Sequence, residues 1–291
     1  MKGVFIDNDH TVGYETNSIF RKIFNLIFIP VLYIFPSRAV HILKKIHVST
    51  EEMVAHAGTH RAMEVIYDVN PRPKANYFQN LFLSVWLGMN NSKAVRNRLR
   101  MVKKEIKRKI HKLSELNKEI KIINIASGSA RAVFESIHEV PLKNDTKLSA
   151  VFVDKNYEAI AFSQQLASTH RFLPSFRWVN DYAHNYLNNN ENKSKFNIAE
   201  VVGLLEYLSD KDAINIFLLI YECLDSDGIL ITTNIVSNFE STFISNSVGW
   251  KMNHRNVDEL SSLLIEAGFK LDKMNIYYEP QRIHCVIVAQ K

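Results

Sequence analysis

The chain has 291 residues, of which 46% are hydrophobic and 23% charged, and its net charge is +6. These are the values of an ordinary globular protein of one or two domains, and the 9 glycines and 7 prolines are too few for a collagen-like or linker-rich chain. The two cysteines, Cys223 and Cys285, lie far apart in apolar surroundings, so we expect free thiols in a reducing compartment and neither a disulfide nor a zinc site.

Apolar residues are most concentrated near the N-terminus, at residues 23–35. This segment contains Pro30 and is too short to span a bilayer as a helix, which takes roughly 20 apolar residues. The residues before it lack the pattern of a signal peptide. We therefore expect a cytoplasmic protein in which the segment packs inside the fold. Two alternatives stay open: a homodimer formed through residues 18–36, and contact with an anionic membrane surface through the flanking cations Arg21, Lys22, Lys44 and Lys45.

Residues 1–118 are predicted to be helical. A helix starts at Ser49, where acidic residues follow in the first turn, and ends before Pro71. Aromatic residues between Tyr77 and Trp86 indicate helix packing. From Ser92 onward, apolar residues recur at three- and four-residue spacing and predict one long amphipathic helix: Val95, Leu99, Val102 and Ile106.

The end of this helical region is basic. Between Lys93 and Lys121 there are twelve lysines and arginines against three glutamates. A helix face exposed to water is the simplest interpretation. Contact with an anionic partner, such as a membrane surface or a nucleic acid, is the alternative.

From residue 119 onward, apolar strand-like runs alternate with helical segments. The predicted strands are 121–126, 148–154, 176–180, 196–203, 228–235, 270–278 and 283–290, and the predicted helices are 130–140, 157–169, 210–224 and 256–267. Regular alternation indicates an α/β domain with a mostly parallel sheet covered on both faces. The last two strands leave no room for a crossover helix and predict an antiparallel hairpin at one edge. We thus predict a helical N-terminal cap at 1–118, for the acceptor or for dimerisation, and an α/β domain at 119–291.

Small and polar residues follow each of the first four predicted strands. They are Ala126, Ser127, Gly128 and Ser129 after the first strand, Asp154 and Lys155 after the second, Asn180, Asp181 and Tyr182 after the third, and Gly203 and Leu204 after the fourth. Because α/β proteins bind ligands where parallel strands end, we expect one site here. Backbone N–H groups after Gly128 can meet an anionic group. Asp154 and Asp181 can accept hydrogen bonds from ribose hydroxyls and from an adenine amine, so the set indicates a nucleoside cofactor.

Two phosphate-binding motifs are excluded. A GxGxxG loop would need glycines where Ala126 and Arg131 stand, and GxxxxGK[ST] is absent. At "NIASGSAR", "VVGLLEYLSD", "LDSDGILITTNI" and "IEAGFKLDKM" the chain resembles the class I S-adenosylmethionine-dependent methyltransferases, over residues 119–291. The resemblance implies a Rossmann-like, seven-stranded sheet and S-adenosylmethionine as cofactor. It also implies that Asp154 binds the ribose and Asp181 lies beside the adenine.

The cofactor loop departs from the family pattern. Asn124 stands where the family has an acid, so the charge that faces the amino end of the cofactor is missing, and Ala126 and Ala130 replace glycines. Each added methyl group narrows the loop without blocking it if φ stays negative. We therefore expect a working but tightened cofactor loop that includes Asn124.

A narrower similarity, carried by "SARAVFE", "GLLEYLSDK", "TNIVSNFESTF" and "GWKMNHRNVDEL", is to bacterial methyltransferases that make the methyl ester of a hydroxy fatty acid signal. It implies O-methylation of a carboxylate or hydroxyl on a small-molecule or lipid-like acceptor. A hydroxyl acceptor needs a general base, for which His254 is the candidate, and a carboxylate acceptor needs a clamp, for which Arg255 is the candidate. Trp250 and Tyr207 are expected in the acceptor pocket.

Three other interpretations of the sequence compete with this one. His56 and His60 are spaced like a metal-binding pair on one helix face, but no third ligand is evident and we expect no metal. A nucleic-acid methyltransferase would use the basic helix at 93–121, although no (Asn/Asp)-Pro-Pro-aromatic motif follows the fourth strand, so nucleic acid is the weaker alternative. The third is a non-catalytic nucleoside-binding protein whose site was lost at Asn124 and Ala126.

Overall fold

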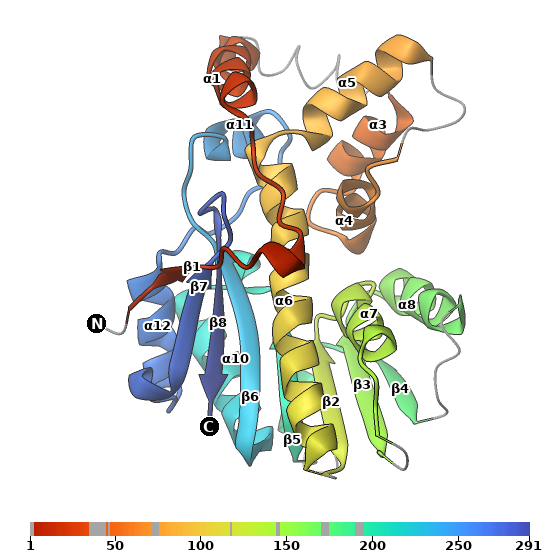
Figure 1. Cartoon of the computed structure of the whole chain (residues 1–291), viewed down its shortest axis with the longest axis vertical. Coiled ribbons are helices and arrows are strands. Elements are labelled where there is room, and N and C mark those ends of the chain that lie inside the picture. Colours follow the sequence, from red (N-terminus) through yellow and green to blue (C-terminus); the bar gives the residue numbers. More distant parts are fainter. Residues whose placement is uncertain are drawn as a thin grey trace.

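The computed structural model describes residues 3–34, 45, 47–70, 76–116, 118–143, 146–169, 175–189 and 195–291, without the side chains of 28, 29, 31–34 and 169. In Figure 1 a sheet with helices on both faces forms the lower part of the molecule, and a group of N-terminal helices stands above it.

The helices and strands have the following bounds. The strands are β1 (Phe5–Ile6), β2 (Ile120–Ile125), β3 (Leu148–Asp154), β4 (Phe176–Asn180), β5 (Phe196–Val201), β6 (Leu224–Ile235), β7 (Met274–Tyr278) and β8 (His284–Gln290). The α-helices are α1 (Ile19–Ile34), α3 (Val48–Ala55), α4 (His60–Tyr67), α5 (Tyr77–Leu87), α6 (Asn90–Glu115), α7 (Arg131–Glu139), α8 (Tyr157–Thr169), α9 (Ala183–Asn188), α10 (Asp210–Cys223), α11 (Ser241–Asn246) and α12 (Val257–Glu266). The 3-10 helices are η1 (His10–Val12), η3 (Leu205–Tyr207) and η4 (Leu271–Lys273).

The sheet has the strand order β1-β7-β8-β6-β5-β2-β3-β4. Among these strands only β8 runs antiparallel to its neighbours, β6 and β7. The predicted α/β fold with a mostly parallel sheet and a terminal antiparallel hairpin is therefore confirmed. The two-residue β1 pairs with β7 and adds an eighth strand outside the hairpin.

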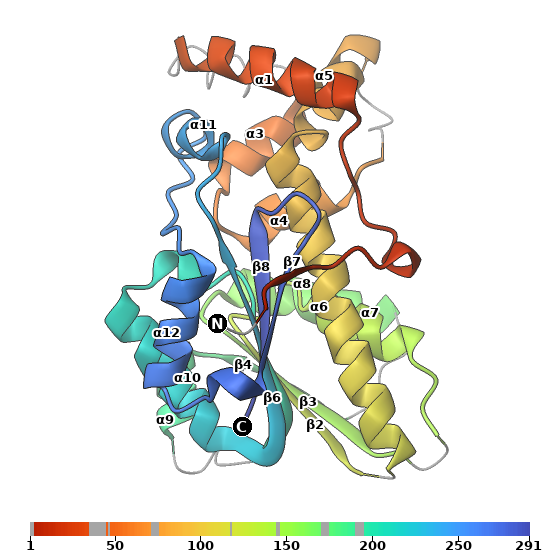
Figure 2. The same cartoon turned by 60° about the vertical axis from the view of Figure 1, so that its left-hand side comes forward.

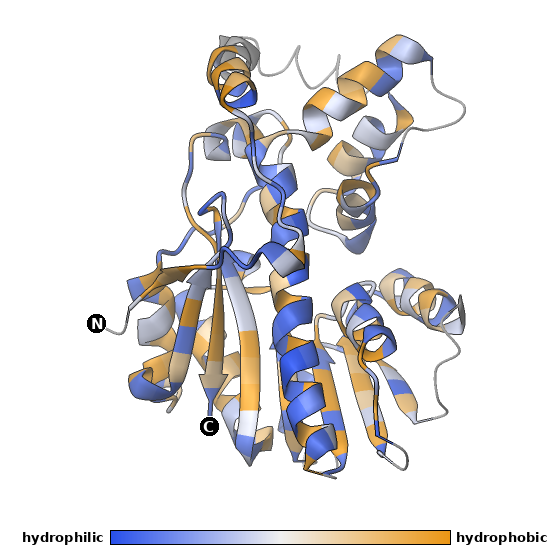
Figure 3. Cartoon of the chain, in the orientation of Figure 1, coloured by the Kyte–Doolittle hydropathy of each residue, from blue (hydrophilic) through white to orange (hydrophobic). Residues whose placement is uncertain are grey.

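Two apolar layers flank the sheet, because its central strands are buried on both faces. Ile123 and Ile125 of β2 pack toward α9, α10 and α12, whereas Ile120 and Ile122 pack toward α6 and α7. Figure 2 shows α10 and α12 on one side of the sheet and α6 on the other, and Figure 3 shows how strongly apolar the strands are. This explains why the strands appear in the sequence as near-continuous apolar runs and not as alternating ones.

Helix α6 is the predicted long amphipathic helix. Its apolar stripe is buried against α7 and the sheet, with Val102 and Ile106 fully buried. Its first N–H groups, those of Asn90 and Asn91, donate to the carboxylate of Glu240 at 2.9 and 2.8 Å. A negative charge at this end is favourable, because the N–H groups of a helix N-terminus carry partial positive charge.

The basic residues of α6 are largely paired within the protein. Lys103 contacts Glu135 and Glu139, Lys104 contacts Asp7 and Asp9, Lys107 contacts Glu139, Arg96 and Arg100 contact Glu15, and Arg108 contacts Glu105. The basic face of α6, which we expected to be exposed to water, is thus largely covered. The N-terminal strap (residues 3–18) and α7 cover it. Apart from Glu105, the acidic residues that pair with these cations lie far away in the chain.

Helix α1 contradicts the expectation that the apolar N-terminal segment packs inside the fold. Among its described side chains, Leu26 is 61% exposed and Ile27 is 64% exposed, whereas Asn25 is buried. Within the described part of the chain, no helix is long and apolar enough to cross a bilayer. The membrane contact and the homodimer suggested for residues 18–36 remain predictions. Lys44 and part of this segment lie outside the described residues.

The helix expected from Ser49 to Pro71 is two helices. Helix α3 begins at Val48, and the chain turns at Gly58, whose φ of +81° is a left-handed conformation that glycine adopts without steric cost. His56 is the C-cap that follows α3, and His60 is the first residue of α4, so the expectation that the two histidines share one helix face is wrong.

Candidate active site

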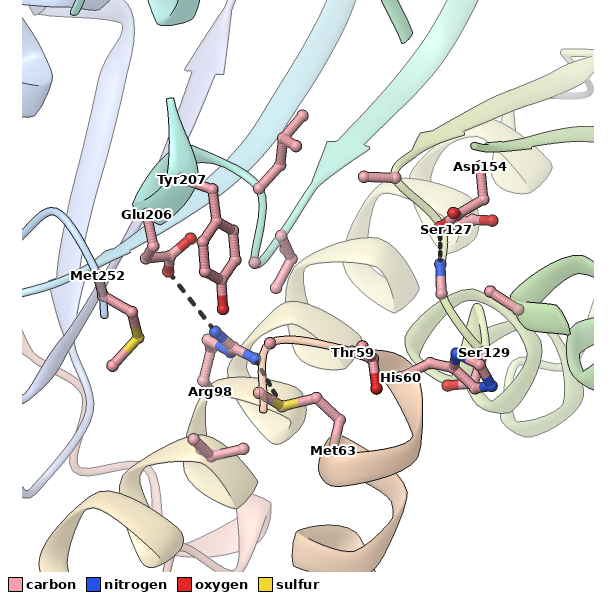
Figure 4. A pocket seen from close by; sticks show the side chains of 18 of the residues that line it. Thr59, His60, Met63, Arg98, Ser127, Ser129, Asp154, Glu206, Tyr207 and Met252 are labelled. Carbon is pink, nitrogen blue, oxygen red and sulfur yellow. Dashed lines mark hydrogen bonds and ion pairs between the residues drawn. The ribbon is translucent and has the colours of Figure 1, made fainter. Parts of the chain in front are cut away.

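A single cavity of about 1010 Å³ joins the carboxyl ends of the strands to the N-terminal helices. Its lower wall includes the turn after β2, and its upper wall includes α4, α5 and the segment from α11 to Met252. Figure 4 shows Thr59 and His60 facing this turn, with Arg98 and Glu206 on the opposite side. A volume of this size lies at the upper end of the range for small-molecule sites, so it can hold two ligands side by side.

The turn after β2 is the predicted cofactor loop, and its backbone is strained. Ala126, Gly128 and Ala130 have φ of 53°, 53° and 54°. The condition stated above, that φ stays negative at the two alanines, is therefore not met. The Ser127 N–H donates to the carbonyl of Val153 and the Ala130 N–H donates to the carbonyl of Ser127, so the chain reverses within five residues and needs the left-handed region. Each alanine in this region costs about 1–2 kcal/mol.

Asp154 closes this loop from the end of β3. One carboxylate oxygen accepts the Gly128 N–H at 2.8 Å, and the other accepts the Asn156 N–H at 2.8 Å. A carboxylate has about four acceptor positions, so two remain for a ligand. Asp154 and Lys155 both line the cavity. Asp154 thus holds the loop and can still bind a hydroxyl group.

The residues after β4 lie at the same rim. Asp181 and Tyr182 line the cavity, whereas Asn180 does not and donates its amide to the carbonyl of Asp154 at 3.0 Å. One Asp181 oxygen accepts the Tyr182 N–H and the Asn185 side chain. Of the three residues predicted here, the structure therefore brings two into the cavity.

The segment after β5 lines the middle of the cavity. Gly203, Leu204 and Tyr207 face it, as does Trp250. The Trp250 indole donates to the Tyr207 hydroxyl at 2.6 Å, which fixes two aromatic walls against each other. All four had been predicted as site residues.

His254 and Arg255 are not among the residues that line this cavity. Arg255 is 6% exposed, and its guanidinium donates to Asp210 and to the carbonyls of Leu205 and Leu208, at 2.6–2.8 Å. These bonds hold the turn at η3 in place. The guanidinium is already occupied, so it is not placed to clamp an acceptor carboxylate.

The cavity is also lined by a buried polar cluster, which the sequence did not predict. It consists of Arg98 on α6, Glu200 on β5, Glu206 on η3 and His284 on β8, all at most 5% exposed. Arg98 lies 3.8 Å from Glu206 and 3.7 Å from the Met63 sulfur (Figure 4). Arg98 Nε, Glu200 Oε2 and both ring nitrogens of His284 have no hydrogen-bond partner among the described residues. Only the apolar run around Glu200 could have signalled this cluster, because a charged residue inside a fully buried strand is unusual.

Burial changes the protonation of this cluster. It raises the pKa of Glu200 to about 8 and raises the pKa of Glu206, although Arg98 opposes both shifts. It lowers the pKa of His284 well below its usual value, and the charge of Arg98 adds to this. At neutral pH, Glu200 is therefore mostly protonated and His284 is neutral.

The remaining wall of the cavity is apolar and rich in methionine. It includes Met53, Met63, Met89, Met252, Trp86, Phe243 and Val248. Methionine side chains are flexible and polarisable, so they can adapt to ligands of varied shape. This part, which we call the methionine chamber, lies between the cluster and the N-terminal helices.

The strained loop gives a stability prediction. We expect Ala126→Gly and Ala130→Gly to leave the free energy of unfolding unchanged or to raise it by about 1 kcal/mol, because the relief of left-handed strain matches or exceeds the entropy cost of glycine. Ala126→Val should lower it by about 1–3 kcal/mol, because a β-branched residue fits this region poorly. Urea denaturation measures all three. Ala161→Gly, on the exposed face of α8, is the control and should lose about 1 kcal/mol.

Glu200 gives a pH prediction. The folded protein holds a proton on Glu200 up to about pH 8, whereas the unfolded chain releases it near pH 4.5. The stability that this group contributes is therefore complete below pH 4.5 and is lost as the pH rises to about 8. Glu200→Gln removes this loss, so the melting temperature of the variant minus that of the wild type should increase from pH 5 to pH 8 and then level off. A constant difference would contradict the buried position of this carboxyl group.

Comparisons with known proteins give one matching family and several solved structures with a similar fold. A family model described as "Putative methyltransferase" matches residues 57–291, which is well over half of the chain. A structure from Bordetella parapertussis described as a "possible exported protein" is 13% identical, with a TM-score of 0.66 over 81% of this chain and 80% of that one. Magnesium protoporphyrin IX methyltransferase from Synechocystis PCC 6803, with bound SAH, is 10% identical, with a TM-score of 0.54 over 78% of this chain and 90% of that one.

No curated protein matches the sequence. The structural neighbours are too distant in sequence to show more than the fold, so the assignment depends on the family model. The chain belongs to this methyltransferase family.

Proposed function

We propose that the enzyme transfers the methyl group of S-adenosylmethionine to an oxygen atom of a small, largely apolar, lipid-like acceptor. The observation that carries this proposal is the continuous cavity that connects the cofactor loop to the methionine chamber. An enzyme that transfers a group from a donor to an acceptor must hold both reacting atoms in one enclosed space.

The loop side of the cavity fits S-adenosylmethionine. The Ser127 hydroxyl is buried there without a hydrogen-bond partner among the described residues, and so is one ring nitrogen of His60. Buried polar groups of this kind are normally satisfied, so they indicate a polar ligand. In the proposed arrangement Asp154 binds the ribose hydroxyls and Asp181 the adenine amine. The backbone of Ala126–Ser129, together with Asn124, Lys155, Tyr182, Gly203 and Leu204, surrounds the rest of the cofactor.

The methionine chamber fits the apolar body of the acceptor. Tyr207 and Trp250 stand where the chamber meets the polar cluster, and we assign them to the acceptor pocket. The N-terminal helices form the upper wall of this chamber, which supports the proposal that residues 1–118 select the acceptor.

Methyl transfer here needs little beyond orientation. Bound S-adenosylmethionine supplies an electrophilic methyl group, which the acceptor oxygen attacks in line as the bond to sulfur breaks. A carboxylate acceptor attacks without losing a proton. For a hydroxyl acceptor, His284 is a better candidate for the general base than His254, because it lines the cavity and both of its ring nitrogens lack a hydrogen-bond partner among the described residues.

The polar cluster can also orient an acceptor. Arg98 has an unpartnered Nε in the cavity wall, so it replaces Arg255 as the cation that could hold an acceptor carboxylate. The pairing of the α6 cations inside the protein leaves the nucleic-acid interpretation without a specific observation in its favour.

The cofactor proposal predicts the result of a calorimetric titration. The wild type should bind S-adenosylmethionine and S-adenosylhomocysteine and not NADH. Asp154→Ala and Asp154→Asn should weaken binding by about 10-fold or more, because a hydrogen bond to a charged group is lost. Asp227→Ala, an exposed carboxylate whose backbone lies at the start of β6, is the matched control. Wild-type protein that is folded but binds neither sulfur nucleoside would refute the proposed function.

The acceptor proposal predicts the outcome of a methyl-transfer assay. We expect turnover with fatty acids or hydroxy fatty acids that improves with chain length, because each added methylene group buries more apolar surface. Val248→Phe narrows the methionine chamber and should raise the acceptor KM about 10-fold or more without changing the affinity for the cofactor. Ile265→Phe, on the exposed side of α12, is the control. An acceptor KM that is unaffected by Val248→Phe would place the acceptor elsewhere.

A further inference from the structure

Glu200 occupies a buried position in the middle of the site. It lies on β5 directly beside Asn124 of β2 in the strand register, and it lines the cavity. Neighbours in register on adjacent parallel strands point to the same face of the sheet. Position 124 and position 200 therefore present their side chains to the same part of the cavity.

The hydrogen bonds of Glu200 are incomplete. Its side chain bonds to the Asn124 side chain, while Oε2 is buried without a partner among the described residues. Leaving a buried acceptor unsatisfied costs about 1–3 kcal/mol, and more if the group is charged. A donor or a cation in the cavity would remove this cost.

Among the described residues, no salt bridge joins a cation to Glu200. Arg98 is the cation that acts on Glu200 electrostatically, but its side chain contacts Glu206, Met63 and Tyr67. Glu206 is a second carboxyl group beside the same guanidinium. The cluster thus contains two acids for one arginine. A bound cation would favour the ionised form of Glu200, which is mostly protonated without one.

We propose, on the basis of the function proposed above, that Glu200 receives the ammonium group of the amino-acid end of S-adenosylmethionine. The acid that is missing at position 124 is thereby supplied one strand away, by a carboxyl group that shares its face of the sheet. Asn124 orients this carboxyl group through their mutual hydrogen bond, and Oε2 accepts from the ammonium.

Three ligands separate this role from the alternatives. S-adenosylmethionine carries both a sulfonium and an ammonium group, S-adenosylhomocysteine carries only the ammonium, and 5′-methylthioadenosine carries neither. Glu200→Gln should weaken the first two by about 10- to 150-fold, the size expected for a bond to a charged group, and leave the third within about 2-fold. Calorimetry at pH 8 measures the three affinities.

A transposed variant tests the register argument. Asn124→Asp combined with Glu200→Gln returns the acid to β2 and should recover most of the lost affinity for S-adenosylhomocysteine. Glu105→Gln is the matched control, because Glu105 is also 5% exposed with a raised pKa but does not line the cavity. Circular dichroism and the melting temperature verify that each variant is folded. If Glu200→Gln does not fold, Glu200→Asp takes its place in the titrations.

Several outcomes would overturn the inference. An equal loss for all three ligands would mean that Glu200 only supports the fold of the site. A loss for S-adenosylmethionine alone would assign the carboxylate to the sulfonium. No loss for any ligand would exclude contact with the cofactor, and wild-type protein that binds none of the three would refute the proposed function first.

Discussion

The rest of the structure depends on the packing of α6, which belongs to both layers of the molecule. Its 26 residues extend about 39 Å at 1.5 Å per residue. The C-terminal part packs against α7 and the sheet, and the N-terminal part packs against α4 and α5. Arg96 ties these helices together, because its guanidinium donates to the carbonyls of Ile66 and Leu87 at the ends of α4 and α5 and pairs with Glu15. A rigid helix that is fixed at both ends determines where the N-terminal helices stand above the cofactor loop.

The cavity follows from this arrangement. The loop side is built from backbone and short polar side chains, and the far side from methionine and aromatic side chains. Arg98, two residues beyond Arg96 on the same helix, is carried to the boundary between them. The buried polar groups there have fewer partners than they need, which lowers the stability of the protein alone. Bound ligands would supply the missing hydrogen-bond partners, since functional sites commonly contain groups that the fold by itself leaves unsatisfied.

The cofactor loop shows the same conflict between fold and function. Ala126 and Ala130 stand in a conformation that favours glycine, and Asp154 holds Gly128 between them. The surrounding structure must impose this backbone, because alanine alone would avoid it. His60 lies against Gly128: its Cβ is 3.6 Å from the place where a Cβ added to Gly128 would stand. Helix α4 therefore helps to close the loop.

The sequence by itself determined the α/β alternation, the seven strands and the four longer helices after residue 119 (α7, α8, α10 and α12), the long helix α6, and the loops that carry Asp154, Asp181 and Gly203. These follow from local periodicity and from the rule that parallel strands end at one edge, and neither needs knowledge of distant contacts. The sequence did not predict the short helices α9 and α11. Tertiary structure alone decided the partners of charged and apolar side chains. It placed Arg255 against Asp210 and away from the cavity, gathered Arg98, Glu200, Glu206 and His284 from four separate segments, and left the apolar side chains of α1 exposed. Contacts between residues this far apart in the chain depend on how whole layers pack, and that information is absent from any local stretch of sequence.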